Sequence, residues 1–209
     1  DLAEEKQAVM ATGNKYSSWF KPVNFDFEKA KQETFIEGVK PLEGQTLRDR
    51  FVEMYSVQHF LIRRDFVMEH ELSFDTTTRF YSDMTFCVKL LKLAVGKMWV
   101  DGDSLYIWRH RNDQIHLPAL CQKKRGHRSG EFLDAYDKCL QIIKSEDKDI
   151  RFALDHSLMN FFWRKYPARI LRENAPKFAK AMANMPEWKN VIKEYGVLQR
   201  LQLSITRKG

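Results

Sequence analysis

Cysteine, glycine and proline are all scarce in this chain. Its 209 residues include three cysteines, nine glycines and six prolines. Three widely spaced cysteines do not form the disulfide framework of a small secreted domain, so we expect a reducing compartment. With few glycines, a backbone-lined loop that cradles phosphate is hard to build. A mass of 24.8 kDa allows one sizeable core or a short array of helix pairs.

Long apolar runs are also missing. No stretch approaches the roughly eighteen consecutive apolar residues of a spanning helix, and the N-terminus lacks the pattern of a secretory signal. We therefore expect a soluble protein without a membrane span. The chain starts with Asp1, which fits a mature end left after removal of a targeting peptide. A basic chain with few cysteines and such an end predicts a location in the mitochondrial matrix.

Recognisable reaction motifs are absent from the sequence. It has no P-loop, dinucleotide fingerprint, metalloprotease helix motif or nucleophile elbow. A thiol enzyme would need a cysteine beside a base such as His59, His70 or His156. Cys87 and Cys139, however, fall on apolar helical stripes, where a thiol is usually inert. We therefore predict a protein that is not an enzyme and that uses no cofactor.

One cluster has the side chains for a metal site. Four potential zinc ligands lie within eighteen residues: His110, His116, Cys121 and His127. They are separated by five, four and five residues, without the shorter separation that presents two ligands from one turn of a zinc knuckle. We predict surface histidines and no metal here. Zinc or thiol chemistry at Cys121 is the third alternative for function, and elemental analysis would detect the zinc.

Positive charge is in excess. The net charge is +7 and the pI is about 9.2, which predicts attraction to nucleic acid, anionic lipid or an acidic protein. A basic loop follows Trp108, and its candidate partner-binding residues are Arg109, Arg111, Lys123, Lys124, Arg125 and Arg128. Basic residues beside an aromatic suit a phosphate backbone with a stacked base, and equally suit an acidic protein surface. No RNA-recognition or helix-turn-helix pattern accompanies them.

Apolar segments begin at regular intervals along the chain. Asp75, Asp113 and Asp149 each precede an apolar-periodic segment, and Pro186 begins another. The intervals are 38, 36 and 37 residues, which is typical of stacked helical hairpins that bury their faces against neighbours. We therefore predict a mainly α fold, a short α-solenoid of antiparallel helical hairpins.

Apolar positions three and four residues apart predict the individual helices. Their expected starts are Thr46, Asp75 or Thr76, Ser129, Asp149, Asn174 and Pro186. The helix from Thr46 is expected to run to about Phe66. Residues 98–108 are the exception, because the turn-forming residues 101–104 lie between β-branched and aromatic segments. A small β-hairpin or a helix with a tight turn would fit there.

We expect three parts in the chain. Residues 1–23, with a turn signal at Gly13-Asn14, form an N-terminal arm. Residues 24–196 form the helical-repeat domain, and residues 197–209 form a C-terminal arm. Four aromatic residues that a small domain would not bury together are candidates for partner contact: Trp19, Phe20, Trp163 and Trp188.

Between Ser129 and Met185, the order of helix, polar break, Asp-capped helix, proline and helix resembles the repeats of the pentatricopeptide and tetratricopeptide families. The resemblance covers roughly residues 46–195 and implies a concave or lateral protein-binding surface. The chain is also similar to the pentatricopeptide-like accessory subunits of the ATP synthase head in euglenozoan protists. That similarity implies a mitochondrial subunit with a structural role.

The sequence therefore predicts a non-catalytic structural or adaptor subunit of a larger protein assembly, with the ATP synthase catalytic head as the candidate. The alternative is an RNA-associated protein, such as a mitochondrial ribosomal or RNA-processing subunit. A salt titration separates the two, because RNA binding through phosphates weakens steeply with added salt.

Overall fold

The computed structural model describes residues 2–18, 38–44, 46–47, 57–58, 60–109, 128–165 and 174–185. The chain folds into two compact units. The sheet unit takes residues 1–43, 58–71 and 94–125, and the helical unit takes residues 44–57, 72–93 and 126–209. Each unit is therefore assembled from separate segments of the sequence.

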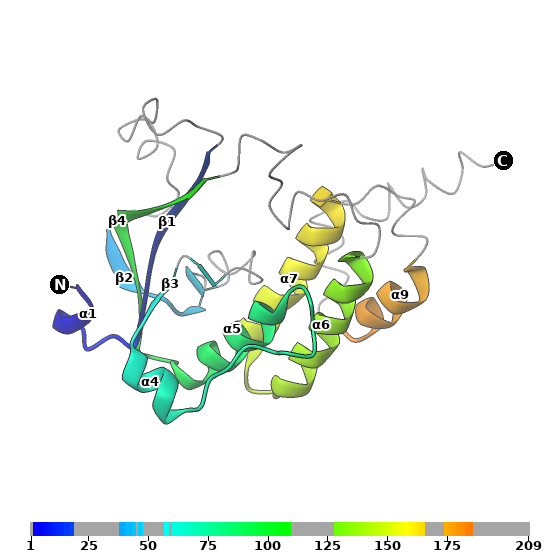
Figure 1. Ribbon diagram of the computed structural model, residues 1–209, viewed down its shortest axis with the longest axis horizontal. Coiled ribbons are helices and arrows are strands. Elements are labelled where there is room, and N and C mark those ends of the chain that lie inside the picture. Colours follow the sequence, from blue (N-terminus) through cyan, green and yellow to red (C-terminus); the bar gives the residue numbers. More distant parts are fainter. Residues whose placement is uncertain are drawn as a thin grey trace. The chain divides into compact units, whose positions relative to one another are not determined.

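The expected mainly α solenoid is wrong, because a four-stranded mixed sheet accompanies the helices and the protein has an α/β fold. The strands are β1 (Met10–Ser18), β2 (Val39–Pro41), β3 (Phe60–Ile62) and β4 (Met98–Arg109). Their order across the sheet is β2-β4-β1-β3, with the two long strands at the centre (Figure 1). β1 runs parallel to β4, and the short edge strands β2 and β3 run antiparallel to their neighbours.

Residues 98–108 are strand, but the expected β-hairpin is wrong. Both halves of β4 pair with β1 in the same direction, so that Met10 lies opposite Met98 and Asn14 lies opposite Leu105. The two halves do not pair with each other, because the expected turn at residues 101–104 is a bulge inside one continuous strand.

Gly13 and Asn14 of β1 accommodate this bulge. A Cβ atom at Gly13 would lie 2.4 Å from the carbonyl oxygen of Ser104, so only glycine leaves room for the extra residues. The Asn14 side-chain Nδ2 donates a hydrogen bond of 2.7 Å to the Gly102 carbonyl. The residues that indicated a turn in an N-terminal arm therefore lie in a central strand.

β3 also replaces the end of an expected helix. The apolar spacing predicted a helix from Thr46 to about Phe66, and residues 46 and 47 are helical. Residues 60–62, however, form β3, and the short helix α4 (Arg64–Glu69) follows it. Phe60 and Ile62 are half-buried and Leu61 is 77% exposed, which is the period of two that a strand imposes. The apolar spacing of these residues fits both a helix and a strand, and their pairing with β1 selects the strand. The sheet unit also contains helix α1 (Leu2–Glu5).

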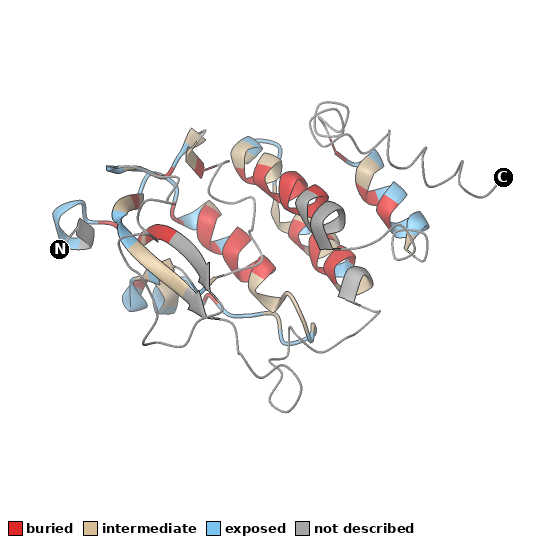
Figure 2. Cartoon of the chain, turned by 90° about the horizontal axis from the view of Figure 1, so that it is seen from above, coloured by how far each residue is buried: buried red, intermediate tan, exposed pale blue. Residues whose placement is uncertain are grey.

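The helical unit contains α5 (Ser82–Leu93), α6 (Arg128–Ile142), α7 (Lys148–Lys165) and α9 (Ala175–Ala183). Figure 2 shows the buried positions of these helices in red. Large side chains from three helices form the core: Met84, Val88 and Leu91 of α5, Phe132 and Tyr136 of α6, and Leu154 and Leu158 of α7. Lys92 of α5 donates to the Ile142 carbonyl at the C-terminus of α6, with a distance of 2.6 Å, which is a favourable place for a cation.

Three expected helix starts are confirmed within one residue. They are those at Ser129, Asp149 and Asn174, where α6, α7 and α9 begin. The start at Asp75 is wrong, because α5 begins at Ser82. Asp75 instead accepts hydrogen bonds from the backbone and hydroxyl of Thr77, at 2.8 and 2.6 Å, and so closes a turn.

The remaining expected boundaries fall differently on the structure. Residues 10–18, assigned to an N-terminal arm, form β1. Residues 24–196 are shared between both units. The starts expected at Asp113 and Pro186, and residues 197–209, lie outside the described residues. Among the described helices, none is long and apolar enough to cross a bilayer.

Candidate functional site

The two faces of the sheet differ in burial. Met10 and Thr12 of β1 and Met98 and Val100 of β4 are buried. Because side chains alternate along a strand, the positions between them lie on the opposite face. We call that opposite side the open face, and it is the candidate functional site.

The strand register arranges the open face in rows, since directly paired residues place their side chains on the same side. The central row runs across four strands through Leu61, Ala11, Trp99 and Pro41. The next row contains Gly13, Asp101 and Val39. In the central row, Leu61 is 77% exposed, Pro41 is exposed, and Ala11 and Trp99 are half-buried. The central row is therefore an accessible apolar strip, which we call the apolar row.

A basic cavity lies beside the apolar row. The Arg63 amide donates to the Val9 carbonyl at 3.0 Å, and the Val9 amide donates to the Lys97 carbonyl at 2.9 Å. These hydrogen bonds bring the three residues together just beyond the ends of β1, β3 and β4. With Glu4 and Gln7, they line a cavity of about 610 Å³.

The cations of the open face differ in their partners. Arg63 forms an ion pair with Asp65, with Nε 3.1 Å from Oδ1. Lys6 lies over the Trp99 ring, 5.5 Å from its centroid, in a cation–π contact. Within the described part of the chain, the Lys97 ammonium has no ion-pair partner. The apolar strip therefore lies beside a lysine that has no direct ion-pair partner among the described residues, and this combination suits binding.

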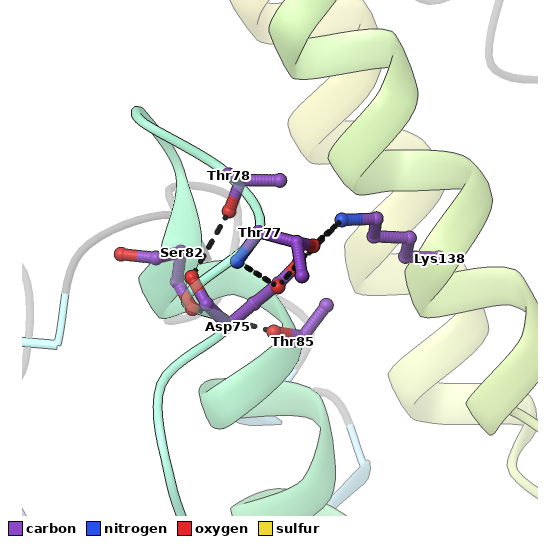
Figure 3. A network of polar contacts seen from close by, with 6 residues as sticks. All are labelled: Asp75, Thr77, Thr78, Ser82, Thr85 and Lys138. Atoms are coloured by element: carbon purple, nitrogen blue, oxygen red, sulfur yellow. Dashed lines mark hydrogen bonds and ion pairs between the residues drawn. The ribbon is translucent and has the colours of Figure 1, made fainter.

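Several polar side chains of the helical unit form structural contacts. The clearest is the loop before α5, where the Lys138 ammonium on α6 donates to Asp75 Oδ2 and to Thr77 Oγ1, each at 2.6 Å. Figure 3 shows the Asp75 carboxylate between Thr77 and Lys138. Hydrogen bonds from Lys138 and from Thr77 hold the pKa of Asp75 well below its ordinary value. The Asp75 carboxylate is therefore ionised at neutral pH, and its oxygens are already bound by Thr77 and Lys138.

A second polar contact lies in the core of the helical unit. The Tyr136 hydroxyl donates to Asp155 at 2.6 Å, and Arg151 Nε donates to both Asp155 oxygens at 3.0 and 3.1 Å. Burial, followed by the charge of Asp155, raises the pKa of Tyr136. The phenol therefore stays protonated, and the network stabilises the packing of α6 on α7.

The buried thiols are poor nucleophiles. Cys87 and Cys139 are fully buried, as the apolar stripes predicted. Burial, followed by the charge of Asp83, raises the pKa of Cys87. Burial and then the charges of Asp75 and Asp83 raise the pKa of Cys139 to about 12. Both thiols are neutral at physiological pH, and a thiolate is what nucleophilic catalysis requires.

No metal centre is formed by the residues that the structure describes, because no three of their His, Cys, Asp and Glu side chains form a suitable group. The expected histidine and cysteine cluster from His110 to His127 lies outside these residues.

The partner-binding residues expected from the sequence lie largely outside the described parts. Arg109 ends β4, Arg128 begins α6 and Trp163 lies in α7, but their side chains are not described. The others lie outside altogether: Trp19, Phe20, Arg111, Lys123, Lys124, Arg125 and Trp188.

Sequence reasoning missed the residues of the open face. Leu61 and Arg63, like Lys97 and Trp99, are two residues apart, which places each pair on one side of an extended chain. This spacing was the available signal, but only the pairing of β1 with β3 and β4 brings the two pairs together.

Comparison with known proteins identifies no relative, since no protein-family model and no curated protein matches the chain.

Proposed function

We propose that the protein is a non-catalytic adaptor subunit that docks onto another protein through the open face of the sheet unit. The observation that carries this proposal is the accessible apolar row with Leu61 at its edge. Large apolar side chains in water are costly, and a cluster of them on a soluble domain is typical of a protein interface.

The distribution of exposed apolar residues supports the same proposal. Among the described residues, the exposed large apolar side chains are Val39, Leu61, Phe74, Leu93, Met68 and Val95. Four of these six belong to the sheet unit, where they are Val39, Leu61, Met68 and Val95. In the helical unit, the contacts of Asp75 and Asp155 join neighbouring helices, and this unit serves as a support for the sheet unit.

Protein is favoured over RNA as the partner of this face. Acidic and basic residues nearly balance in the described part of the sheet unit, whereas a nucleic-acid surface needs a clear excess of basic residues. The assembly predicted from the sequence, a mitochondrial one with the ATP synthase head as candidate, stays a prediction of the same kind.

Two matched leucine variants test the proposal. Leu61→Gln changes the open face, and Leu93→Gln changes an exposed leucine of the helical unit that is 44% accessible. Each tagged variant is purified from the source organism beside the wild type, and the co-purifying chains are quantified by mass spectrometry. We expect Leu61→Gln to lose a stoichiometric protein partner that Leu93→Gln retains. Equal recovery of partners by both variants, or an RNase-sensitive complex, would overturn the proposal.

A further inference from the structure

We propose that the open face binds an extended, apolar segment of the partner protein and that a carboxylate side chain of this segment enters the basic cavity. This inference rests on the proposed function and adds the chemistry of the partner. It follows from the spacing and the charge of the two neighbouring features on the open face.

The spacing fits an extended segment. The basic cavity lies directly beyond the apolar row along the chain, because its residues Val9, Arg63 and Lys97 each stand two positions from a member of that row: Ala11, Leu61 and Trp99. Two residues of a strand span roughly 6.6 Å. A partner in an extended conformation presents alternate side chains with the same repeat. One of its apolar side chains can therefore lie on the apolar row while the next side chain on that face reaches the cavity.

The charge favours a single carboxylate. Lys97 has no ion-pair partner among the described residues, and Arg63 adds a second cation that is 50% exposed and shared with Asp65. Glu4 lines the same cavity, and its negative charge opposes a doubly charged phosphate more than a carboxylate. The set matches an Asp or Glu side chain that accepts from Lys97 and Arg63.

The frame of the cavity is already in place. The backbone hydrogen bonds among Arg63, Val9 and Lys97 fix the three chain segments that carry the cavity walls. Removal of the Lys97 ammonium leaves these bonds intact, because Lys97 contributes its carbonyl to them. A side-chain variant at this position therefore tests binding without removing the fold.

A phage-displayed library of short random peptides, selected on the full chain, provides the test. Enriched peptides are expected to carry an Asp or Glu two positions from a large apolar residue. Lys97→Gln should weaken such a peptide by about fivefold or more in titration calorimetry, and Lys89→Gln, at an exposed lysine of the helical unit, should not. Replacement of the peptide's acid by its amide should cause the same loss on the wild type and little further loss on Lys97→Gln.

The outcomes separate this inference from the proposed function. Enriched peptides without an acid, or equal binding by wild type and Lys97→Gln, would overturn the proposal that a carboxylate enters the basic cavity. If Leu61→Gln still weakens peptide binding in that case, docking through the open face is retained. Failure of any peptide to be enriched, or peptide binding that is unchanged in Leu61→Gln, overturns this inference. Equal recovery of partners by Leu61→Gln and Leu93→Gln overturns the proposed function as well. Melting curves of each variant confirm that the fold is retained.

Discussion

The Tyr136 hydroxyl on α6 donates a hydrogen bond to the Asp155 carboxylate on α7, and both side chains are buried. Arg151, one turn before Asp155 on α7, binds the same carboxylate and also donates to the carbonyl of Asn184 after α9. One carboxylate and its two donors therefore connect α6, α7 and the end of α9.

Replacement of Tyr136 by phenylalanine should destabilise the protein. The variant keeps the ring in the core but removes one donor from a buried carboxylate, which costs about 1–3 kcal/mol. Chemical denaturation at neutral pH measures the change. In a double-mutant cycle with Asp155→Asn, the double variant should lose less stability than the two single variants lose together, because both substitutions remove one shared interaction. Strict additivity would show that the hydroxyl does not stabilise this carboxylate.

Lys138→Met should release the loop before α5. Asp75 then loses its charged donor, and we expect a loss of about 1 kcal/mol in the free energy of unfolding at pH 7. The matched control is Lys177→Met, whose ion pair with Asp134 has side chains 55% and 53% exposed and should change stability by less than about 0.5 kcal/mol.

The Lys138→Met effect should depend on pH with a definite sign. The folded-state pKa of Asp75 lies below its ordinary value of 3.8. Its contribution is therefore fully present above pH 3.8 and is lost as the pH falls from there through the lowered pKa. The gap between wild type and Lys138→Met should shrink in acid, and a gap that widens in acid would contradict this assignment.

Asp83→Asn should stabilise the protein at neutral pH. Burial at the start of α5 raises the pKa of Asp83 from 3.8 to about 6, although the amides of Asp83 and Val57 donate to it. Ionisation of the buried Asp83 carboxyl therefore destabilises the folded protein. The free energy of unfolding falls as the pH rises from 3.8 through about 6, and the total loss is at most about 3 kcal/mol. Thermal melts at several pH values should show the variant and wild type alike near pH 4 and the variant more stable at pH 7. Lower stability of the variant at pH 7 would contradict this.

Gly13→Ala should disrupt the bulge of β4. The new methyl group would collide with the Ser104 backbone, and such overpacking costs about 1–3 kcal/mol. Gly130→Ala is the control, because its Cβ would lie 3.3 Å from the Asn174 side chain and no backbone stands in its way. Alanine is also the better helix former in α6. Chemical denaturation should show a clear loss in the free energy of unfolding for Gly13→Ala and none for Gly130→Ala. Equal losses in the two variants would contradict the bulge geometry.

The sequence predicted the helices that have strong local signals. Ser129 and Asp149 precede regular apolar stripes, and Pro176 lies in the first turn of α9, where proline is favoured. These signals act within a few residues and are independent of the rest of the fold. The start predicted at Asp75 failed because an aspartate side chain stabilises a turn as readily as a helix start.

The sheet could not be predicted in the same way. β1 is polar and contains Gly13-Asn14, a dipeptide that indicates a turn, and only its pairing with β4 explains both residues. The open face depends on the same pairing, because Leu61 and Trp99 come from distant segments. Local spacing predicts the face of the strand on which each residue lies, but it does not predict which strand lies beside it.

The parallel pairing of β1 with β4 has a consequence for biosynthesis. Asn14 and Gly102, which anchor the bulge, are 88 residues apart in sequence. While the ribosome translates the intervening segment, β1 has no partner along the edge that later faces β4, and this delay exposes a strand to aggregation. The nascent chain should therefore depend on chaperones until β4 has left the exit tunnel.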